Sequence, residues 1–157
     1  MEHIELNHPV PDVEVAATGE RLIRLSDLRG HPVVLYFYPK DNTPGCTTES
    51  RDFRDHYAEF QALDTIILGV SRDDLRSHEA FRRQEELPFD LLADTDERLC
   101  QLFAVIKLKN RYGKQVMGIE RSTFLIDHQG ILRREWRQVK VPGHVVEVLA
   151  AVRELTG

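Results

Sequence analysis

Residues 33–53 constrain this chain more than any other stretch. They read VVLYFYPKDNTPGCTTESRDF, an unbroken apolar run up to Tyr38 followed by Pro39, a polar loop and Pro44-Gly45. The apolar run is too short to span a membrane and is bounded by turn residues, as is typical of a strand buried on both faces. The stretch therefore predicts a buried strand, a tight turn and the start of a new element.

The element after Pro44 and Gly45 is expected to be a helix. Neither residue continues a strand, and aromatic side chains then recur at helical spacing, at Phe53, Tyr57 and Phe60. Cys46 would thus lie in the first turn of the helix, where backbone N–H groups lack intrahelical partners and the positive end of the helix dipole lies. Both effects stabilise a thiolate relative to a thiol.

Two interpretations of Cys46 follow from the residues around it. A free cysteine is commonly a small buried hydrophobe that serves packing. Here the thiol lies between Thr43 on one side and Thr47 and Thr48 on the other, a polar and hydroxyl-rich setting. That setting favours a reactive nucleophile.

The composition limits the class of protein. The 157 residues suit a single domain, 1–157, with 41% hydrophobic and 30% charged residues. The net charge of −5 is spread along the chain, so neither nucleic acid nor an anionic membrane is an expected partner. The N-terminus shows no secretory pattern and no apolar run approaches the width of a bilayer, so we expect a cytoplasmic protein. With two cysteines and neither C-x-x-C nor a Cys/His cluster, we expect no disulfide framework, metal or cofactor.

The rest of the chain predicts alternating strands and helices. We expect a β-hairpin extension at 13–17 and 22–25 and a capped turn at 26–30, followed by the 33–38 strand. After the Cys46 helix, which should end at 62–64, we expect a strand at 65–70, a helix capped by Ser71 that ends at 82 or 84, a strand at 89–92, a helix capped by Asp94, a loop at 105–117, strands at 119–126 and 131–139, and a helix at 143–155. This order predicts an α/β protein whose central mixed sheet is flanked by helices, a βαβ half followed by a ββα half.

Several motifs resemble one family. Pro39, Thr43 and Cys46 form P-x-x-x-T-x-x-C, which resembles the peroxiredoxin signature, and FYPKDNTPGCTTE resembles its peroxiredoxin Q branch, also called bacterioferritin comigratory protein. GIERSTFLIDHQG, at 118–130, resembles the later strand of the family that carries an arginine, here Arg121, and the similarity continues through 77–94. The resemblance implies a thioredoxin-like fold and a protein that reduces hydrogen peroxide and organic hydroperoxides. It also implies a monomer, with a weak dimer as the alternative.

The resemblance also gives roles to particular residues. Cys46 would attack the peroxide, and Thr43 would bring its hydroxyl to the thiolate and the incoming oxygen. Arg121 would favour the thiolate and polarise the O–O bond, since a guanidinium keeps its charge and offers several donors in a fixed fork. Pro39 would shield the thiolate from water. Glu49 would either orient the arginine or simply complement the helix N-terminus.

The chain departs from this family in the thiol that resolves the oxidised cysteine. Many peroxiredoxin Q proteins have a second cysteine five residues after the first, where Arg51 stands here, and others have it near Phe81 and Arg82. Cys100 remains, and its spacing from Leu99 suggests a buried structural thiol. We therefore expect a one-cysteine cycle, in which thioredoxin, glutaredoxin with glutathione, or another thiol reduces the sulfenic acid.

Two other functions remain open from the sequence. A thioredoxin-type disulfide reductase would need a second cysteine where Thr43 stands. A peroxide sensor or redox-regulated holdase would use oxidation of Cys46 to unfold the local helix and expose Phe53 and Tyr57 to a partner.

Overall fold

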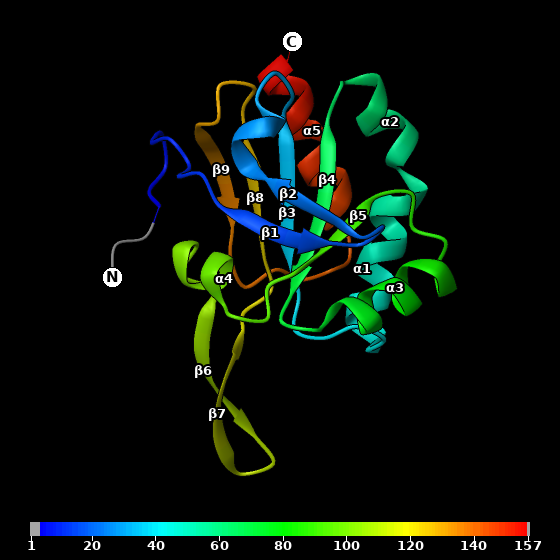
Figure 1. Ribbon diagram of the computed structural model, residues 1–157, viewed down its shortest axis with the longest axis vertical. Coiled ribbons are helices and arrows are strands. Elements are labelled where there is room, and N and C mark those ends of the chain that lie inside the picture. Colours follow the sequence, from blue (N-terminus) through cyan, green and yellow to red (C-terminus); the bar gives the residue numbers. More distant parts are fainter. Residues whose placement is uncertain (1–3, 157) are drawn as a thin grey trace.

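A computed structural model describes residues 4–156 of the chain. Its main sheet has seven strands in the order β2-β1-β5-β4-β3-β8-β9, and a separate two-stranded sheet, β6-β7, projects from one end of the body (Figure 1). The strands are β1 (Glu14–Ala17), β2 (Arg21–Arg24), β3 (Val33–Phe37), β4 (Ile66–Ser71), β5 (Asp90–Ala93), β6 (Ile106–Arg111), β7 (Lys114–Ile119), β8 (Ser122–Ile126) and β9 (Leu132–Trp136). The three strands at the centre, β3, β4 and β5, are parallel, and their neighbours are antiparallel.

The helices follow the predicted βαβ and ββα order. They are η1 (Leu25–Leu28), α1 (Pro44–Asp55), α2 (Tyr57–Ala62), α3 (Leu75–Gln84), α4 (Arg98–Leu102) and α5 (His144–Thr156). The expected α/β, thioredoxin-like architecture with a central mixed sheet is confirmed. Residues 1–3, which open the N-terminal stretch inspected for a targeting signal, lie outside the described range.

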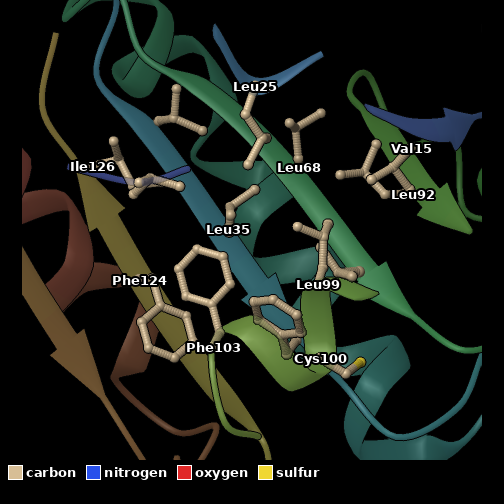
Figure 2. Packing of buried hydrophobic residues seen from close by; sticks show 14 of the residues in the cluster. Val15, Leu25, Leu35, Leu68, Leu92, Leu99, Cys100, Phe103, Phe124 and Ile126 are labelled. Atoms are coloured by element: carbon tan, nitrogen blue, oxygen red, sulfur yellow. The ribbon is translucent and has the colours of Figure 1, made fainter. Parts of the chain in front are cut away.

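The strand β3 separates two hydrophobic cores because successive side chains of a strand point to opposite faces. Leu35 and Phe37 belong to one core, the Leu35-face core, which contains residues of β1 and α4 and is shown in Figure 2. Val34 and Tyr36 belong to the other, the Tyr36-face core, which contains residues of α1, α2, α3 and α5. All five residues of β3 are buried, as the unbroken apolar run predicts.

The N-terminal hairpin is part of the main sheet, more closely integrated than the extension we expected. Ala17 of β1 pairs with Leu92 of β5, and Val15 and Ala17 are buried in the Leu35-face core. In the turn that follows, Ser26 lies inside η1 and does not cap it. The predicted long helix after Cys46 ends at Ala62 as expected, but His56 divides it into α1 and α2.

The expected loop at 105–117 is wrong. Residues of β6 and β7 pair from Ile106 with Ile119 to Arg111 with Lys114, and a turn at Tyr112-Gly113 connects the strands. The sequence of β6, IKLKNR, begins with the alternation of apolar and polar side chains that is typical of strands. The basic residues and the glycine of the segment favour a loop, which is why the prediction was wrong.

The predicted caps of two helices have different outcomes. Ser71 is the last residue of β4, and Asp74 caps α3 instead, its carboxylate accepting a hydrogen bond from the N–H of Ser77 at 2.9 Å. The chain needs three more residues to leave the sheet before a helix can start. Asp94 is not the N-cap residue of α4, which is Glu97, but its carboxylate does bind the start of the helix, accepting from the N–H groups of Leu99 at 3.0 Å and Cys100 at 2.7 Å.

Within residues 4–156, none of the helices combines the length and apolar character that crossing a membrane requires.

Candidate active site

Cys46 is the third residue of α1, in the first turn as predicted. Thr43 precedes the helix with an extended backbone and Pro44 is the first helical residue, where its missing N–H costs no hydrogen bond. The N–H of Thr47 donates to the carbonyl of Thr43 at 2.8 Å. This is the first hydrogen bond of the helix, so the N–H groups of Gly45 and Cys46, which precede it, have no intrahelical acceptor and point out of the N-terminal end of the helix.

Arg121 brings a positive charge to the Cys46 sulfur. It lies between β7 and β8, and its Nη2 donates to Sγ of Cys46 at 3.4 Å. Burial lowers the pKa of Arg121, but the neighbouring Glu49 and Cys46 outweigh that effect and hold the pKa above its ordinary value. The sulfur therefore lies beside a permanent cation in a site where only 1% of the Cys46 residue is exposed.

Glu49 is the second partner of the arginine. Nη1 of Arg121 donates to Oε1 of Glu49 at 2.7 Å, while Oε2 of Glu49 has no hydrogen-bond partner among the described residues. Glu49 is fully buried, and this desolvation raises the pKa of its carboxyl to about 7 although Arg121 opposes the shift. Of the two roles predicted for Glu49, its contact with the guanidinium fits the orienting one.

Gly45 lets the guanidinium approach the helix. A Cβ atom at this position would lie 3.1 Å from Nη2 of Arg121, closer than ordinary van der Waals contact. A side chain there would displace the group that contacts the sulfur. The Pro-Gly-Cys order signalled a turn, but the need for a small residue under Arg121 depends on a contact between segments 76 positions apart.

Thr43 and Pro39 lie on the loop between β3 and α1. The hydroxyl of Thr43 donates to the carbonyl oxygen of Lys40 at 2.9 Å, which leaves its oxygen lone pairs able to accept a hydrogen bond from a bound peroxide. Pro39 is half-buried directly after the last buried residue of the β3 run, Tyr38. The roles given to both remain predictions.

The same loop is anchored by a buried network that the sequence did not reveal. Oδ2 of Asp41 accepts from the hydroxyl of Ser77 at 2.8 Å and from Nδ1 of His78 at 2.7 Å, and the N–H of Asp41 donates to Asp73 at 2.8 Å. Nε2 of His78 donates to the carbonyl of Leu92 at 2.9 Å. This network fixes the loop to α3 and β5.

Part of this network also resembles a metal-binding group. In the described part of the chain, Asp41, Asp73 and His78 bring one possible ligand atom each to within 4.8 Å of one another. Their atoms are already engaged in the hydrogen bonds that fix the loop, which accounts for their proximity without an ion. No sequence spacing could have shown it, since Asp41 and His78 come from different segments.

Cys100 has a different environment. It is fully buried in the Leu35-face core (Figure 2). Cys46 belongs to the Tyr36-face core, so the two thiols lie on opposite faces of the sheet. Burial raises the pKa of Cys100 well above its ordinary value, and the Asp94 carboxylate raises it further. The structure thus agrees with the interpretation of Cys100 as a structural thiol.

Fold and site together define a thiol-dependent redox enzyme of the thioredoxin-like class. Comparison with protein families agrees: residues 6–135 match the AhpC/TSA family, and the chain belongs to this family. It is 49% identical to Peroxiredoxin Bcp of Bacillus subtilis over 153 residues, which cover 98% of each chain. It is also 49% identical over 150 residues to Peroxiredoxin Bcp of Xanthomonas campestris, covering 96% of this chain and 94% of the relative.

Solved structures give the same result. The model matches Xanthomonas campestris peroxiredoxin Q with a TM-score of 0.91 and 47% identity, over 98% of both chains. It matches peroxidoxin BcpB of Mycobacterium tuberculosis with a TM-score of 0.86 and 31% identity, over 98% of this chain and 99% of the other. The resemblance to the peroxiredoxin Q branch, and with it the expectation of a peroxidase, is confirmed.

Proposed function

We propose that this protein reduces hydrogen peroxide and organic hydroperoxides through a sulfenic acid on Cys46, in a one-cysteine cycle that an external thiol completes. The observation that carries the proposal is the contact of the Arg121 guanidinium with Sγ of Cys46 at 3.4 Å, at the start of a helix. A related protein supports the substrate class, since one solved structure of the Xanthomonas campestris bacterioferritin comigratory protein was described for its alkyl peroxide reduction activity.

In the first step the Cys46 thiolate attacks one peroxide oxygen. The new S–O bond forms as the O–O bond breaks, sulfur is oxidised, and the leaving hydroxide or alkoxide takes a proton to become water or an alcohol. Arg121 and the free N–H groups of the first turn stabilise the charge that develops on the leaving oxygen. Thr43 positions the peroxide, Pro39 excludes water, and Glu49 holds the guanidinium in place.

In the second step a thiol from outside attacks the sulfenic acid. A mixed disulfide forms as water leaves, and a second thiol then displaces Cys46 as thiolate. Two observations support an external thiol: Arg51 stands where many peroxiredoxin Q proteins carry their second cysteine, and the remaining thiol, Cys100, lies outside the site. Arg51 is engaged in an ion pair, its Nε lying 2.5 Å from Oε1 of Glu85, and Cys100 lies across the sheet. Pairing of Cys46 with Cys100 would require local unfolding, since a disulfide needs α-carbons within about 7 Å.

The experiment is single-turnover oxidation followed by mass spectrometry. One equivalent of hydrogen peroxide should add one oxygen to Cys46, and dimedone should trap it there. In a parallel sample without dimedone, glutathione or dithiothreitol should restore the thiol. The Cys100→Ser variant should behave in the same way. An intramolecular disulfide between Cys46 and Cys100 as the main product would refute the one-cysteine cycle, and failure of Cys46 to oxidise would refute the proposed activity.

The reductant, the monomeric state and the cytoplasmic location expected from the sequence remain part of this proposal. Thioredoxin, glutaredoxin with glutathione and small thiols are all chemically able to complete the cycle, and comparing their turnover rates would separate them.

A further inference from the structure

The β6-β7 hairpin, residues 106–119, stands apart from the rest of the protein. It forms a two-stranded sheet of its own that projects from the body (Figure 1). At its tip Tyr112 and Gly113 both have positive φ values, 51° and 77°, which is the combination of a type I′ hairpin turn. This conformation is costly for a bulky side chain, yet Tyr112 is fully exposed there. An aromatic side chain is thus presented to solvent at a strained position.

The hairpin is positively charged in an acidic protein. Residues 106–119 contain four cations, Lys107, Lys109, Arg111 and Lys114, and no carboxylate, whereas the whole chain has a net charge of −5. Because side chains alternate along each strand and paired residues share a face, all four cations lie on one face of the hairpin. The hairpin is therefore a local site of attraction for an acidic surface.

The opposite face of the hairpin carries two exposed apolar side chains. Leu108 and Met117 are directly paired across the strands and are 58% and 55% exposed. A two-stranded hairpin gains little stability from such exposed side chains, because they bury no surface. Exposed apolar side chains beside an aromatic tip and a basic face are typical of surfaces that bind another protein.

The base of the hairpin is connected to the active site. The ammonium of Lys109 donates to the carbonyl of Ile119, two residues before Arg121, and the guanidinium of Arg72 donates to the carbonyl of Met117 at 3.4 Å. Burial is the main cause that lowers the pKa of Lys109, and the positive charge of Arg121 is among the further causes. A partner held by the hairpin would thus be brought next to Cys46.

We propose that the hairpin is the docking surface for the protein that reduces oxidised Cys46, and that this partner is a dithiol protein with an acidic, partly apolar surface around its thiol. The inference rests on the proposed peroxidase function. Charge complementarity favours an acidic partner, and the extent of the exposed surface favours a protein over a small thiol. The partner's thiolate attacks the sulfenic acid, water leaves, and its second thiol displaces the Cys46 thiolate, leaving a disulfide on the partner.

The test compares two reductants on the same variants. The main variant is Lys107→Glu/Arg111→Glu/Lys114→Glu, which spares Lys109 because its ammonium binds the main chain. The protein probe is a bacterial thioredoxin, kept reduced by its reductase and NADPH, and the small probe is dithiothreitol. We expect the KM for thioredoxin to rise by about tenfold or more, with turnover by dithiothreitol changed less than about twofold. Added salt should raise the KM of the unmodified protein more than that of the variant.

A matched pair controls for charge alone. Arg111→Glu should raise the KM for thioredoxin, whereas Arg29→Glu should leave it unchanged. Arg29 is also an exposed arginine, but it lies before the start of β3, while Pro39 and the active-site loop follow the other end of that strand. A second variant, Leu108→Ser/Met117→Ser, should also raise the KM for thioredoxin, and the size of this increase should not depend on the salt concentration.

Four results would overturn the proposal. The first two are an unchanged thioredoxin KM in the triple variant, and an equal loss of turnover with both reductants, which would place the effect on the site itself. The third is no reduction of the unmodified protein by thioredoxin while dithiothreitol works, and the fourth is that the unmodified protein is a dimer, which the triple substitution dissociates without changing the thioredoxin KM, so that the hairpin is a contact between copies. Failure with both reductants in the unmodified protein would instead refute the underlying peroxidase function.

Discussion

The two cysteines of this protein have nearly the same local structure and opposite electrostatic surroundings. Each is the third residue of a helix, Cys46 in α1 and Cys100 in α4, and each is almost completely buried. The Arg121 guanidinium donates to the sulfur of Cys46, whereas the Asp94 carboxylate accepts a hydrogen bond from the backbone N–H of Cys100.

This difference shows that a position at the start of a helix does not make a thiol reactive. At Cys46 the Arg121 guanidinium donates to the sulfur, and the residue at the N-cap, Thr43, makes no side-chain cap hydrogen bond. At Cys100 a carboxylate occupies the helix start, binding the N–H groups of Leu99 and Cys100, and its negative charge disfavours ionisation. The two helix starts therefore differ in the sign of the neighbouring charge, and at Cys100 that charge adds to burial, which is the larger cause of the raised pKa.

The largest expected effect is that of removing the sulfur of Cys46. Cys46→Ser should abolish peroxide consumption, because a serine hydroxyl is not ionised at neutral pH and cannot form the S–O bond. Peroxide loss measured with dithiothreitol should fall to the rate without protein. Circular dichroism should show the fold unchanged, and residual turnover through Cys100 would show that the contrast between the two thiols is false.

Removing the positive neighbour should have the next largest effect. Arg121→Ala should lower the second-order rate constant for peroxide by about 100-fold to 1,000-fold, the magnitude typical of losing one preorganised donor. Arg121→Lys, which keeps the charge without the fork, should recover part of the loss. Stopped-flow measurement of sulfenic acid formation gives the rate, and a value equal to that of the unmodified protein would remove Arg121 from the site.

A third prediction concerns Glu49, which shares Arg121 with Cys46. Burial raises the pKa of Glu49 from 4.5 to about 7, so the folded state binds a proton more tightly than the unfolded state. The stabilisation is fully present below about pH 4.5 and is lost as the pH rises to 7, by about 3 kcal/mol in total. Urea unfolding at pH 5 and pH 8 should show this decline in the unmodified protein and a smaller one in Glu49→Gln. Equal declines in both proteins would contradict it.

A smaller effect is expected at the helix start of Cys100. Asp94→Asn weakens the hydrogen bonds at the start of α4 and should lower the free energy of unfolding by about 1 kcal/mol. It should also lower the pKa of Cys100, but only in part, because burial is the larger cause. In a Cys46→Ser background, iodoacetamide should still label Cys100 slowly at pH 9. Fast labelling would show that the charge of Asp94, rather than burial, keeps this thiol silent.

The smallest effect on activity is expected from Cys100→Ser. Peroxide turnover with dithiothreitol should stay within about twofold of the unmodified protein, while stability falls by about 1–2 kcal/mol because a hydroxyl replaces a buried apolar group. A folded but inactive variant would give Cys100 a place in the cycle.

Local patterns were sufficient for most of the fold. The apolar run of β3, the Pro44-Gly45 break and the apolar face of α5 were each read correctly because periodicity and turn chemistry act over a few residues. The segment 105–117 was misread because its alternation is short and basic, and a hairpin whose faces are both exposed offers little burial contrast. The cap of α3 was misplaced because Ser71 and Asp74 are both good capping residues, and only the path of the chain out of β4 chooses between them.

For the site, the sequence predicted Cys46 from its helix position and Arg121 and Glu49 from resemblance, and the structure brings these three side chains into contact. The sequence could not identify Gly45 as the residue that admits the guanidinium, or Asp41 and His78 as the residues that anchor the loop. These depend on contacts between segments that are far apart in the chain, and no spacing rule encodes such contacts.

The sequence by itself determined where the thiol lies along a helix, because backbone N–H groups and turn residues are local properties. Only the tertiary structure decided which charge meets each thiol, since Arg121 reaches Cys46 from a segment 75 residues away and the sheet places Cys100 on the other face. Electrostatic interactions depend on distance in space, and distance in space is set by the packed fold.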